Sequence, residues 1–357
     1  SSGRAMTNLL NRSRLTAILM EVPLAVLVVV LATAAIWVGS DWLEDASAKL
    51  ATYYELPPVV QGGLIAATGS SFPELASVIF AALAGSFGLG VGAIVGSAIF
   101  NVLVIPALAV LVSGRELDST RTLVHKETLF YLLAVVVLFL TFAFALIYNP
   151  VGGSLVDSLS GELTRPLVLL PLAVYVLYLF LQWQDTVDYT AEPSTARIDP
   201  LKQWAWLFGG LLVILVAVER LVHAVIVIGD AAGTSDFLWG VTIVAAATSL
   251  PDTLVSIQAA DRERPVASIA NVVGSNTFDL LVVIPVGILL TGAEPIDFGI
   301  AAPMMGCLVG ATVLLFVMLR TSLVLTRQEA LLLLGAYGVF LVWVLGEALA
   351  VVNLLPG

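Results

Sequence analysis

The chain has 357 residues, of which 59% are hydrophobic and only 11% are charged. Soluble domains carry about 25% charged residues, so this composition excludes an ordinary soluble protein and indicates a helical protein with several membrane spans. The net charge of −11, the single cysteine and the two histidines argue against nucleic-acid binding, an internal disulfide and a soft-ligand metal site.

Long apolar runs predict ten membrane spans, five on each side of a polar stretch. The first five are expected at 24–39, from 58 to a glycine-rich turn at 85–90, and at 91–112, 128–147 and 166–181. The second five are expected at 204–228, 237–260, 266–290, 298–319 and 329–352. We therefore divide the chain into an N-terminal tail (1–20), a first five-helix repeat (21–184), a cytoplasmic linker (185–202) and a second repeat (203–357).

A segment of the first half occurs again in the second half. Residues 62–105 align without gaps on 240–283, with 14 identities in 44 positions. Pro73 falls on Pro251, and an acidic residue follows the proline in both copies. Apolar bias alone does not align such residues, so the pattern indicates an internal duplication. Because five spans is an odd number, the second copy must enter the membrane from the opposite side, which predicts inverted-topology repeats of the kind found in secondary transporters.

Lys and Arg residues predict the orientation. Loops after spans 1, 3, 5, 7 and 9 carry ten of them, and the opposite side carries four. The positive-inside rule then places the ten in the cytoplasm and both termini outside it, for a protein of the cell (inner or plasma) membrane.

The duplicated segments carry polar residues inside predicted spans. Proline lacks an N–H and displaces the carbonyl four residues earlier, so Pro73 and Pro251 should break helices 2 and 7. Helices 3 and 8 carry prolines too and are expected to be broken. If the repeats pack face to face, their oxygen atoms converge. The side chains expected to meet there are Ser70, Ser71, Glu74, Ser97 and Asn101 from the first copy, and Thr248, Ser249, Asp252, Ser275 and Asp279 from the second.

Such a cluster is expensive unless it is neutralised. An ionised acid without a partner costs several kcal/mol in hydrocarbon, so these carboxylates must bind cations or protons. Oxygen ligands suit hard cations, and Ca²⁺ takes six to eight of them at about 2.3–2.6 Å. The competing interpretation is a pair of kinked helices whose protonated acids serve only packing.

The motifs resemble the two repeats of the cation/Ca²⁺ exchanger superfamily. The resemblance rests on Ser70-Ser71-Phe72-Pro73-Glu74 and Gly96-Ser97-Ala98-Ile99-Phe100-Asn101, and on their counterparts Thr248-Ser249-Leu250-Pro251-Asp252 and Gly274-Ser275-Asn276-Thr277-Phe278-Asp279. Within the superfamily, the chain is similar to Na⁺/Ca²⁺ exchangers of the prokaryotic type, which lack a large regulatory loop. The second motif is most similar to the K⁺-dependent branch, in which an aspartate at the position of Asp279 is linked to K⁺ transport.

The resemblance implies a role for each matching residue. Glu74 and Asp252 would be the central Ca²⁺ ligands, and Asn101 and Asp279 would complete the centre. Na⁺ would be bound by the hydroxyls of Ser70, Ser71, Ser97, Thr248, Ser249 and Ser275 and by the carbonyls of Ala67 and Ala245. Two positions depart from the family pattern, namely Ala247, where glycine is usual, and the shorter acid Asp252.

These features predict a secondary antiporter that exchanges Na⁺ for Ca²⁺ by alternating access, with no cofactor and with the lipid bilayer as its surroundings. K⁺-dependent Na⁺/Ca²⁺ exchange and H⁺/Ca²⁺ exchange are the nearest alternatives, followed by a passive cation channel; an enzyme, such as an intramembrane hydrolase, is not expected. Outside the cores, Asp41 and Glu219 also align under the 178-residue shift and are candidates for gating residues on the first and sixth helices.

Overall fold

A computed structural model describes residues 2–54, 67–121, 123–151, 159–184, 198–261 and 265–348. Within these ranges, eight helices are long and apolar enough to cross a membrane, or nine if one bent pair forms a single span. The prediction of an all-helical protein with many spans is therefore confirmed. The predicted second span begins in 55–66, and most of the predicted linker is 185–197, so both lie outside the described residues.

The helices follow the predicted order. The first half contains α1 (Ser2–Tyr53), α2 (Ala67–Ser70), α3 (Phe72–Leu83), α4 (Phe87–Leu103), α5 (Ile105–Ser113), the π-helical turn η2 (Leu123–Glu127), α6 (Thr128–Tyr148) and α7 (Arg165–Gln184). The second half contains α8 (Pro200–Ala232), α9 (Asp236–Trp239), η4 (Gly240–Val244), α10 (Ala245–Thr248), α11 (Leu250–Asp261), α12 (Pro265–Phe278), η5 (Asp279–Val283), α13 (Ile284–Thr291), α14 (Phe298–Ser322) and α15 (Arg327–Ala348).

Two helices break where the prolines predict. Ser71 separates α2 from α3, and Ser249 separates α10 from α11, with a bend of 44° between the segments that flank Ser249. Each proline stands in the first turn of the helix that follows, where its missing N–H would have no acceptor in any case. The breaks therefore need no additional compensation at the proline itself.

The prediction of an equally broken eighth helix is wrong. Residues 265–291 run continuously as α12, η5 and α13. The third helix is interrupted at Val104, between α4 and α5, but 87–113 also forms one span, so the predicted break does not divide it either. Pro285 lies at the start of α13, directly after the π-helical turn η5. A π-helical turn hydrogen-bonds five residues back, so the local change in register absorbs the proline without a sharp bend.

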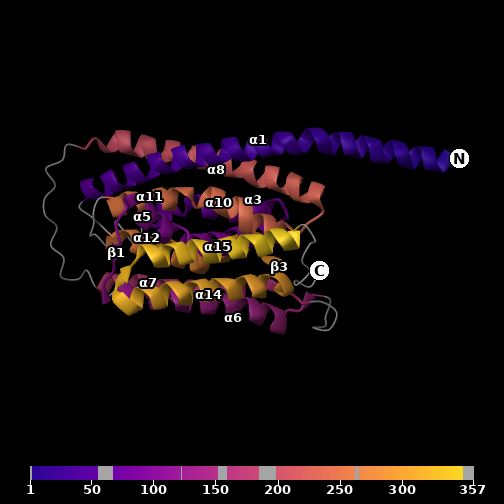
Figure 1. The fold of residues 1–357 in the computed structure, drawn as a ribbon. Helices are drawn as coiled ribbons and strands as arrows, with labels where there is room; N and C mark the ends of the chain where they lie inside the picture. The colour runs from indigo at the N-terminus through magenta and orange to yellow at the C-terminus, as the bar shows by residue number, and fades with distance from the viewer. Residues whose placement is uncertain are drawn as a thin grey trace.

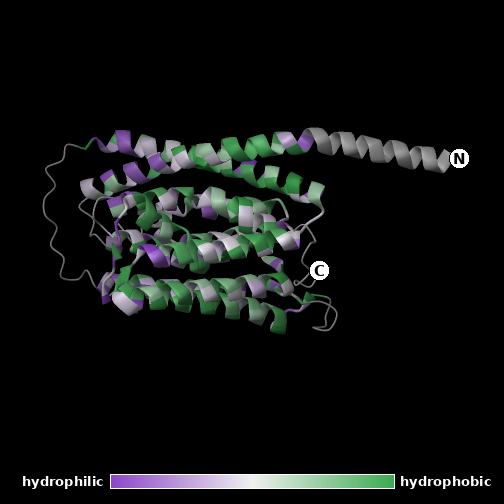
Figure 2. Ribbon diagram, viewed as in Figure 1, coloured by the Kyte–Doolittle hydropathy of each residue, from purple (hydrophilic) through white to green (hydrophobic). Residues whose placement is uncertain are grey.

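The helices form layers (Figure 1). Helices α1 and α8 pack against each other along one side of the molecule and run in opposite directions, while α6 and α14 lie on the other side. The segments α3, α4, α10, α11 and α12 lie between these layers. Apolar residues cover the middle of the long helices (Figure 2). The inner segments are the most buried. In 87–113, 83% of the most apolar stretch of 18 residues lies inside the protein.

The structure also contains two short sheets that the sequence analysis did not predict. Strand β1 (Leu117–Asp118) pairs antiparallel with β4 (Val324–Leu325), and β2 (Ser160–Thr164) pairs antiparallel with β3 (Ala293–Asp297). Each sheet joins a loop of the first half to a loop of the second. Backbone hydrogen bonds thus tie the two halves together at the ends of the helices, where the loops otherwise have no regular partners.

Glycine allows α4 to approach the second half closely. A Cβ atom added to Gly96 would lie 2.2 Å from the carbonyl oxygen of Val241, and one added to Gly92 would lie 2.2 Å from that of Phe237. On the facing segment, a Cβ atom on Gly240 would lie 2.1 Å from the carbonyl oxygen of Leu89. There is no room for a Cβ atom between these two backbones, so only glycine fits at these positions. The close approach places the residues after Gly96 next to the break at Ser249.

Candidate functional site

The predicted polar side chains meet inside the protein. Glu74, Asp252 and Asp279 are fully buried, as are Ser71, Ser97, Asn101, Thr248, Ser249 and Ser275, and Ser70 is 2% exposed. They come from seven segments or the breaks between them: α2, α3 and α4 in the first half, and α10, α11, α12 and η5 in the second. Sequence reasoning therefore identified ten side chains that the fold buries together.

Hydrogen bonds connect the two halves within this cluster. Ser249 Oγ donates to Ser97 Oγ at 2.8 Å, and Ser97 Oγ donates to Glu74 Oε1 at 3.5 Å. Asn101 Nδ2 donates to Asp252 Oδ2 at 3.0 Å. Because Ser249 and Asp252 flank Pro251 at the α10–α11 break, that break turns both residues towards α4.

The remaining predicted side chains surround the same carboxylates. Ser70 and Ser275 lie next to Asp252. Thr248 lies next to Glu74, although its hydroxyl also donates to the carbonyl of Val244 at 3.1 Å. Ser71 lies next to Asp279.

The three carboxylates are close enough to repel one another electrostatically. The charges of Asp279 and Asp252 both act on Glu74, and the charge of Asp252 acts on Asp279. In the part of the chain that the structure describes, no lysine, arginine or histidine forms an ion pair with any of them. Burial and mutual repulsion both disfavour three negative charges here, so the site is unfavourable unless a positive charge enters it or the acids are protonated.

Many oxygens in this cluster have no hydrogen-bond partner. Among the described residues, eleven buried side-chain polar atoms lack one, and six of these belong to the cluster: Ser71 Oγ, Glu74 Oε2, Asn101 Oδ1, Asp252 Oδ1 and both carboxylate oxygens of Asp279. Buried polar groups are nearly always paired, so each exception requires an explanation. Six oxygen atoms without a hydrogen-bond partner in one cluster indicate a place where a cation could bind.

Carboxylates alone do not form this site. Among the described residues, no group of three or more His, Cys, Asp or Glu side chains is arranged to hold a metal ion. A cation bound in this cluster would therefore need hydroxyl, amide or main-chain oxygens among its ligands.

The two predicted carbonyl ligands, Ala67 and Ala245, lie in α2 and α10. Ala245 lies in α10, and its carbonyl accepts from the Ser249 N–H at 3.0 Å and from the Thr248 hydroxyl at 3.4 Å. Ala67 is the first residue of α2. No described contact joins either carbonyl to the carboxylates.

Sequence reasoning missed Asn276. Its Nδ2 donates to the carbonyl of Ala98 at 3.2 Å and to the Tyr131 hydroxyl at 3.1 Å, so its Oδ1 is left to accept from Asn101 Nδ2 at 2.9 Å. Both N–H groups of Asn101 are then used, one towards Asn276 and one towards Asp252. This orients Asn101 Oδ1, which has no partner. Asn276 stands inside the quoted motif, so its position was a signal that it belongs to the site.

The aligned acids Asp41 and Glu219 do not have equivalent surroundings. Asp41 lines a cavity between α1 and α11. Glu219 is partly exposed on α8 and pairs with Arg220 at 3.0 Å. The duplication therefore places an acid on both helices, but the fold gives only one of them access to this cavity.

Comparisons with known proteins agree with this architecture. The model of the family described as "Sodium/calcium exchanger protein" matches residues 24–184 and 202–346. The putative antiporter CaxA of Alkalimonas amylolytica is 29% identical over 318 residues, which cover 85% of this chain and 92% of that protein.

Two solved structures have the same fold. The sodium–calcium exchanger NCX_Mj, soaked with Na⁺ and Sr²⁺, superposes with a TM-score of 0.61 at 26% identity, covering 90% of this chain and 98% of that one. An H⁺/Ca²⁺ exchanger, CAX, superposes with a TM-score of 0.70 at 18% identity, covering 92% and 85%. The second match shows the fold alone.

Proposed function

Because the chain belongs to the sodium/calcium exchanger protein family, we propose that it exchanges Na⁺ for Ca²⁺ across the membrane by alternating access. The observation that carries this proposal is the set of six buried oxygens without partners on Ser71, Glu74, Asn101, Asp252 and Asp279. Ca²⁺ takes six to eight oxygen ligands at about 2.3–2.6 Å, and its charge offsets the repulsion between the acids. The buried carboxylates are therefore stable when the ion is present and costly when it is absent.

We assign the ions to overlapping places in this cluster. Glu74 and Asp252 are the central Ca²⁺ ligands, with Asn101 and Asp279 beside them. Na⁺ ions take the hydroxyl oxygens of Ser70, Ser71, Ser97, Thr248, Ser249 and Ser275 and the carbonyls of Ala67 and Ala245. Since several of these hydroxyls lie beside the carboxylates that hold Ca²⁺, Na⁺ and Ca²⁺ occupy overlapping places and exclude one another, which is what exchange requires.

Alternating access follows from the duplicated architecture. We propose ten spans as two inverted repeats, 21–184 and 203–357, with a cytoplasmic linker at 185–202, a tail at 1–20 and both termini outside the cytoplasm. The crossed pair α1 and α8 then moves against the inner segments that hold the site. Movement is favoured when cations neutralise the acids and opposed when the acids are bare, because crossing the apolar interior with net charge is expensive.

Ca²⁺ uptake into proteoliposomes tests the proposal. With an outward-directed Na⁺ gradient, the wild-type protein should accumulate Ca²⁺, and replacing internal Na⁺ by choline should abolish the uptake. Glu74→Gln and Asp252→Asn should each abolish it, because each removes a carboxylate from the centre of the site. Glu162→Gln, which removes an exposed acid in β2, is the matched control and should transport normally. Uptake that survives in both site variants would refute the assignment.

H⁺/Ca²⁺ exchange is the second candidate, because buried carboxylates are neutralised by protons as well as by Na⁺. K⁺-dependent exchange is the third, because both carboxylate oxygens of Asp279 are free to take an additional cation. Varying pH and K⁺ at a fixed Na⁺ gradient separates the three. A flux that needs no counter-ion and does not saturate would instead indicate a passive channel.

A further inference from the structure

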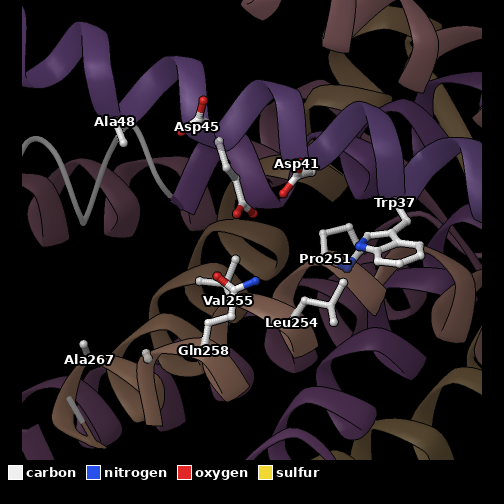
Figure 3. A pocket seen from close by; sticks show the side chains of 11 residues that line it. Trp37, Asp41, Asp45, Ala48, Pro251, Leu254, Val255, Gln258 and Ala267 are labelled. Atoms are coloured by element: carbon white, nitrogen blue, oxygen red, sulfur yellow. The ribbon is translucent and has the colours of Figure 1, made fainter. Parts of the chain in front are cut away.

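A second acidic site lies outside the central cluster. A cavity of about 510 Å³ opens between the last turns of α1 and the outer face of α11. Trp37, Asp41 and Asp45 line it from α1, and Pro251 and Gln258 line it from α11 (Figure 3). We refer to this cavity as the vestibule.

Glu44 distinguishes the vestibule from an ordinary cluster of surface acids. It lines the cavity, and its Oε1 atom is buried without a hydrogen-bond partner. Asp45, in contrast, is paired with Lys49 on the same helix. A carboxylate at the edge of a cavity with one oxygen buried and unpaired is a costly arrangement unless a cation or a proton neutralises it.

The vestibule lies beside the central site. Pro251, which lines it, directly precedes Asp252, and Glu44 is near enough to Asp252 for the two carboxylates to repel each other. A cation that leaves Asp252 towards the vestibule therefore meets Glu44 next. Asp41 lies three residues before Glu44 on the same helix and lines the same cavity.

We propose that Asp41 and Glu44, with the side-chain amide of Gln258, form an outer capture site that binds hydrated Ca²⁺ on its way between the vestibule and Asp252. This inference rests on the proposed function only for the identity of the transported ion. The site holds the ion with part of its water shell, because the cavity is wide and the side chains line it from two helices.

The capture site is restricted to one face of the protein. The residue that aligns with Asp41 in the second repeat is Glu219, which pairs with Arg220 and is not one of the residues that line the vestibule. Removing the vestibule acids should therefore affect Ca²⁺ entry from the face where α1 ends and not from the opposite face.

A binding experiment tests the site without requiring transport. The purified full-length double variant Glu74→Gln/Asp252→Asn, which keeps only Asp279 of the three central carboxylates, is titrated with Tb³⁺, and emission is excited through tryptophan. Tb³⁺ in the vestibule lies near Trp37, so a saturable signal is expected, and Trp37→Phe should lower its amplitude without changing the half-saturating concentration. Adding Glu44→Gln should weaken binding roughly tenfold, the order expected when one partly desolvated carboxylate is lost; Glu44→Asp should largely restore it.

The absence of a saturable signal in the double variant, or a signal that Glu44→Gln leaves unchanged, would overturn the proposal. Asp41→Asn gives a second measurement in case Glu44→Gln fails to fold. Neither outcome depends on whether the wild-type protein exchanges Na⁺ or H⁺.

A flux measurement then tests the role in transport. With wild-type exchange established, Glu44→Gln should raise the KM for Ca²⁺ about tenfold from the vestibule face and leave the KM from the opposite face and the maximal rate unchanged. Glu116→Gln, which removes an exposed acid just before β1, is the matched control for surface charge and should change neither. Equal changes from both faces would show that Glu44 serves packing and not capture.

Discussion

The close contact between α4 and η4 gives the sharpest prediction. An alanine at Gly96 would place its Cβ atom 2.2 Å from the carbonyl oxygen of Val241, 2.6 Å from its Cα and 2.7 Å from its carbonyl carbon. All three are main-chain atoms, so no side chain can rotate away. Ordinary contact begins near 3.4 Å, so the two segments must separate by about 1.2 Å.

That separation reaches the site directly. Ser97 follows Gly96 and accepts the hydrogen bond from Ser249 at 2.8 Å. Moved by the same displacement, the two oxygens would be about 4.0 Å apart, beyond hydrogen-bonding distance. We expect Gly96→Ala to lower the free energy of unfolding by about 1–3 kcal/mol, the usual cost of overpacking. Transport should fall by roughly 100-fold, the order that a 1 Å misplacement of binding groups produces.

The assay is Na⁺-driven Ca²⁺ uptake in proteoliposomes, combined with thermal unfolding of the purified protein. Gly88→Ala is the matched control because it makes the same change at the start of the same helix, where no described atom lies within 4 Å of the added Cβ. It should transport normally and gain slight helix stability. Normal uptake and an unchanged unfolding temperature for Gly96→Ala would refute the close-contact argument.

Three further predictions concern other parts of the structure. Asn276→Ala removes the acceptor that orients Asn101 and should raise the KM for Ca²⁺ in the flux assay roughly tenfold, the effect of about 1–3 kcal/mol for an amide left without its partner; an unchanged KM would show that Asn101 is oriented by other means. Gly161→Ala places a Cβ atom 2.4 Å from the backbone nitrogen of Leu146 and should lower the unfolding temperature, since β2 must move away from α6; wild-type stability would contradict this. Asp199→Ala removes the acceptor for two N–H groups at the start of α8 and should cost about 0.5–2 kcal/mol of stability in denaturant titrations, with ion affinities unchanged.

The sequence was sufficient to predict which polar side chains gather inside the protein. Pro73 and Pro251 interrupt helices wherever those helices lie, because proline always lacks an N–H. An acid next to such a break in an apolar span has a high free energy in contact with lipid, so it is expected in a shared polar centre. These are local constraints, so Glu74, Asp252 and the hydroxyls around them could be predicted without coordinates.

The strand pairs could not be predicted, for a different reason. Strands β2 and β3 are five residues long and are separated by more than a hundred residues. Their pairing depends on which loops the packed helices bring to the same end of the molecule. Neither segment alone has a pattern that distinguishes it from an irregular loop.

The bends and the vestibule were likewise decided by packing. Pro285 has the same chemistry as Pro251, yet the helix around Pro285 continues through a π-helical turn while the helix before Pro251 bends by 44°. Glu44 looks like any other acid on a helix until the fold buries its Oε1 atom beside the cavity that α11 also lines.

Sequence alone thus determined which groups must avoid lipid, because the cost of a charge or an unpaired carbonyl in hydrocarbon is a property of the group itself. The tertiary structure decided which of those groups face one another and which atoms are left without a partner, since that depends on distances between segments that the chain does not connect directly.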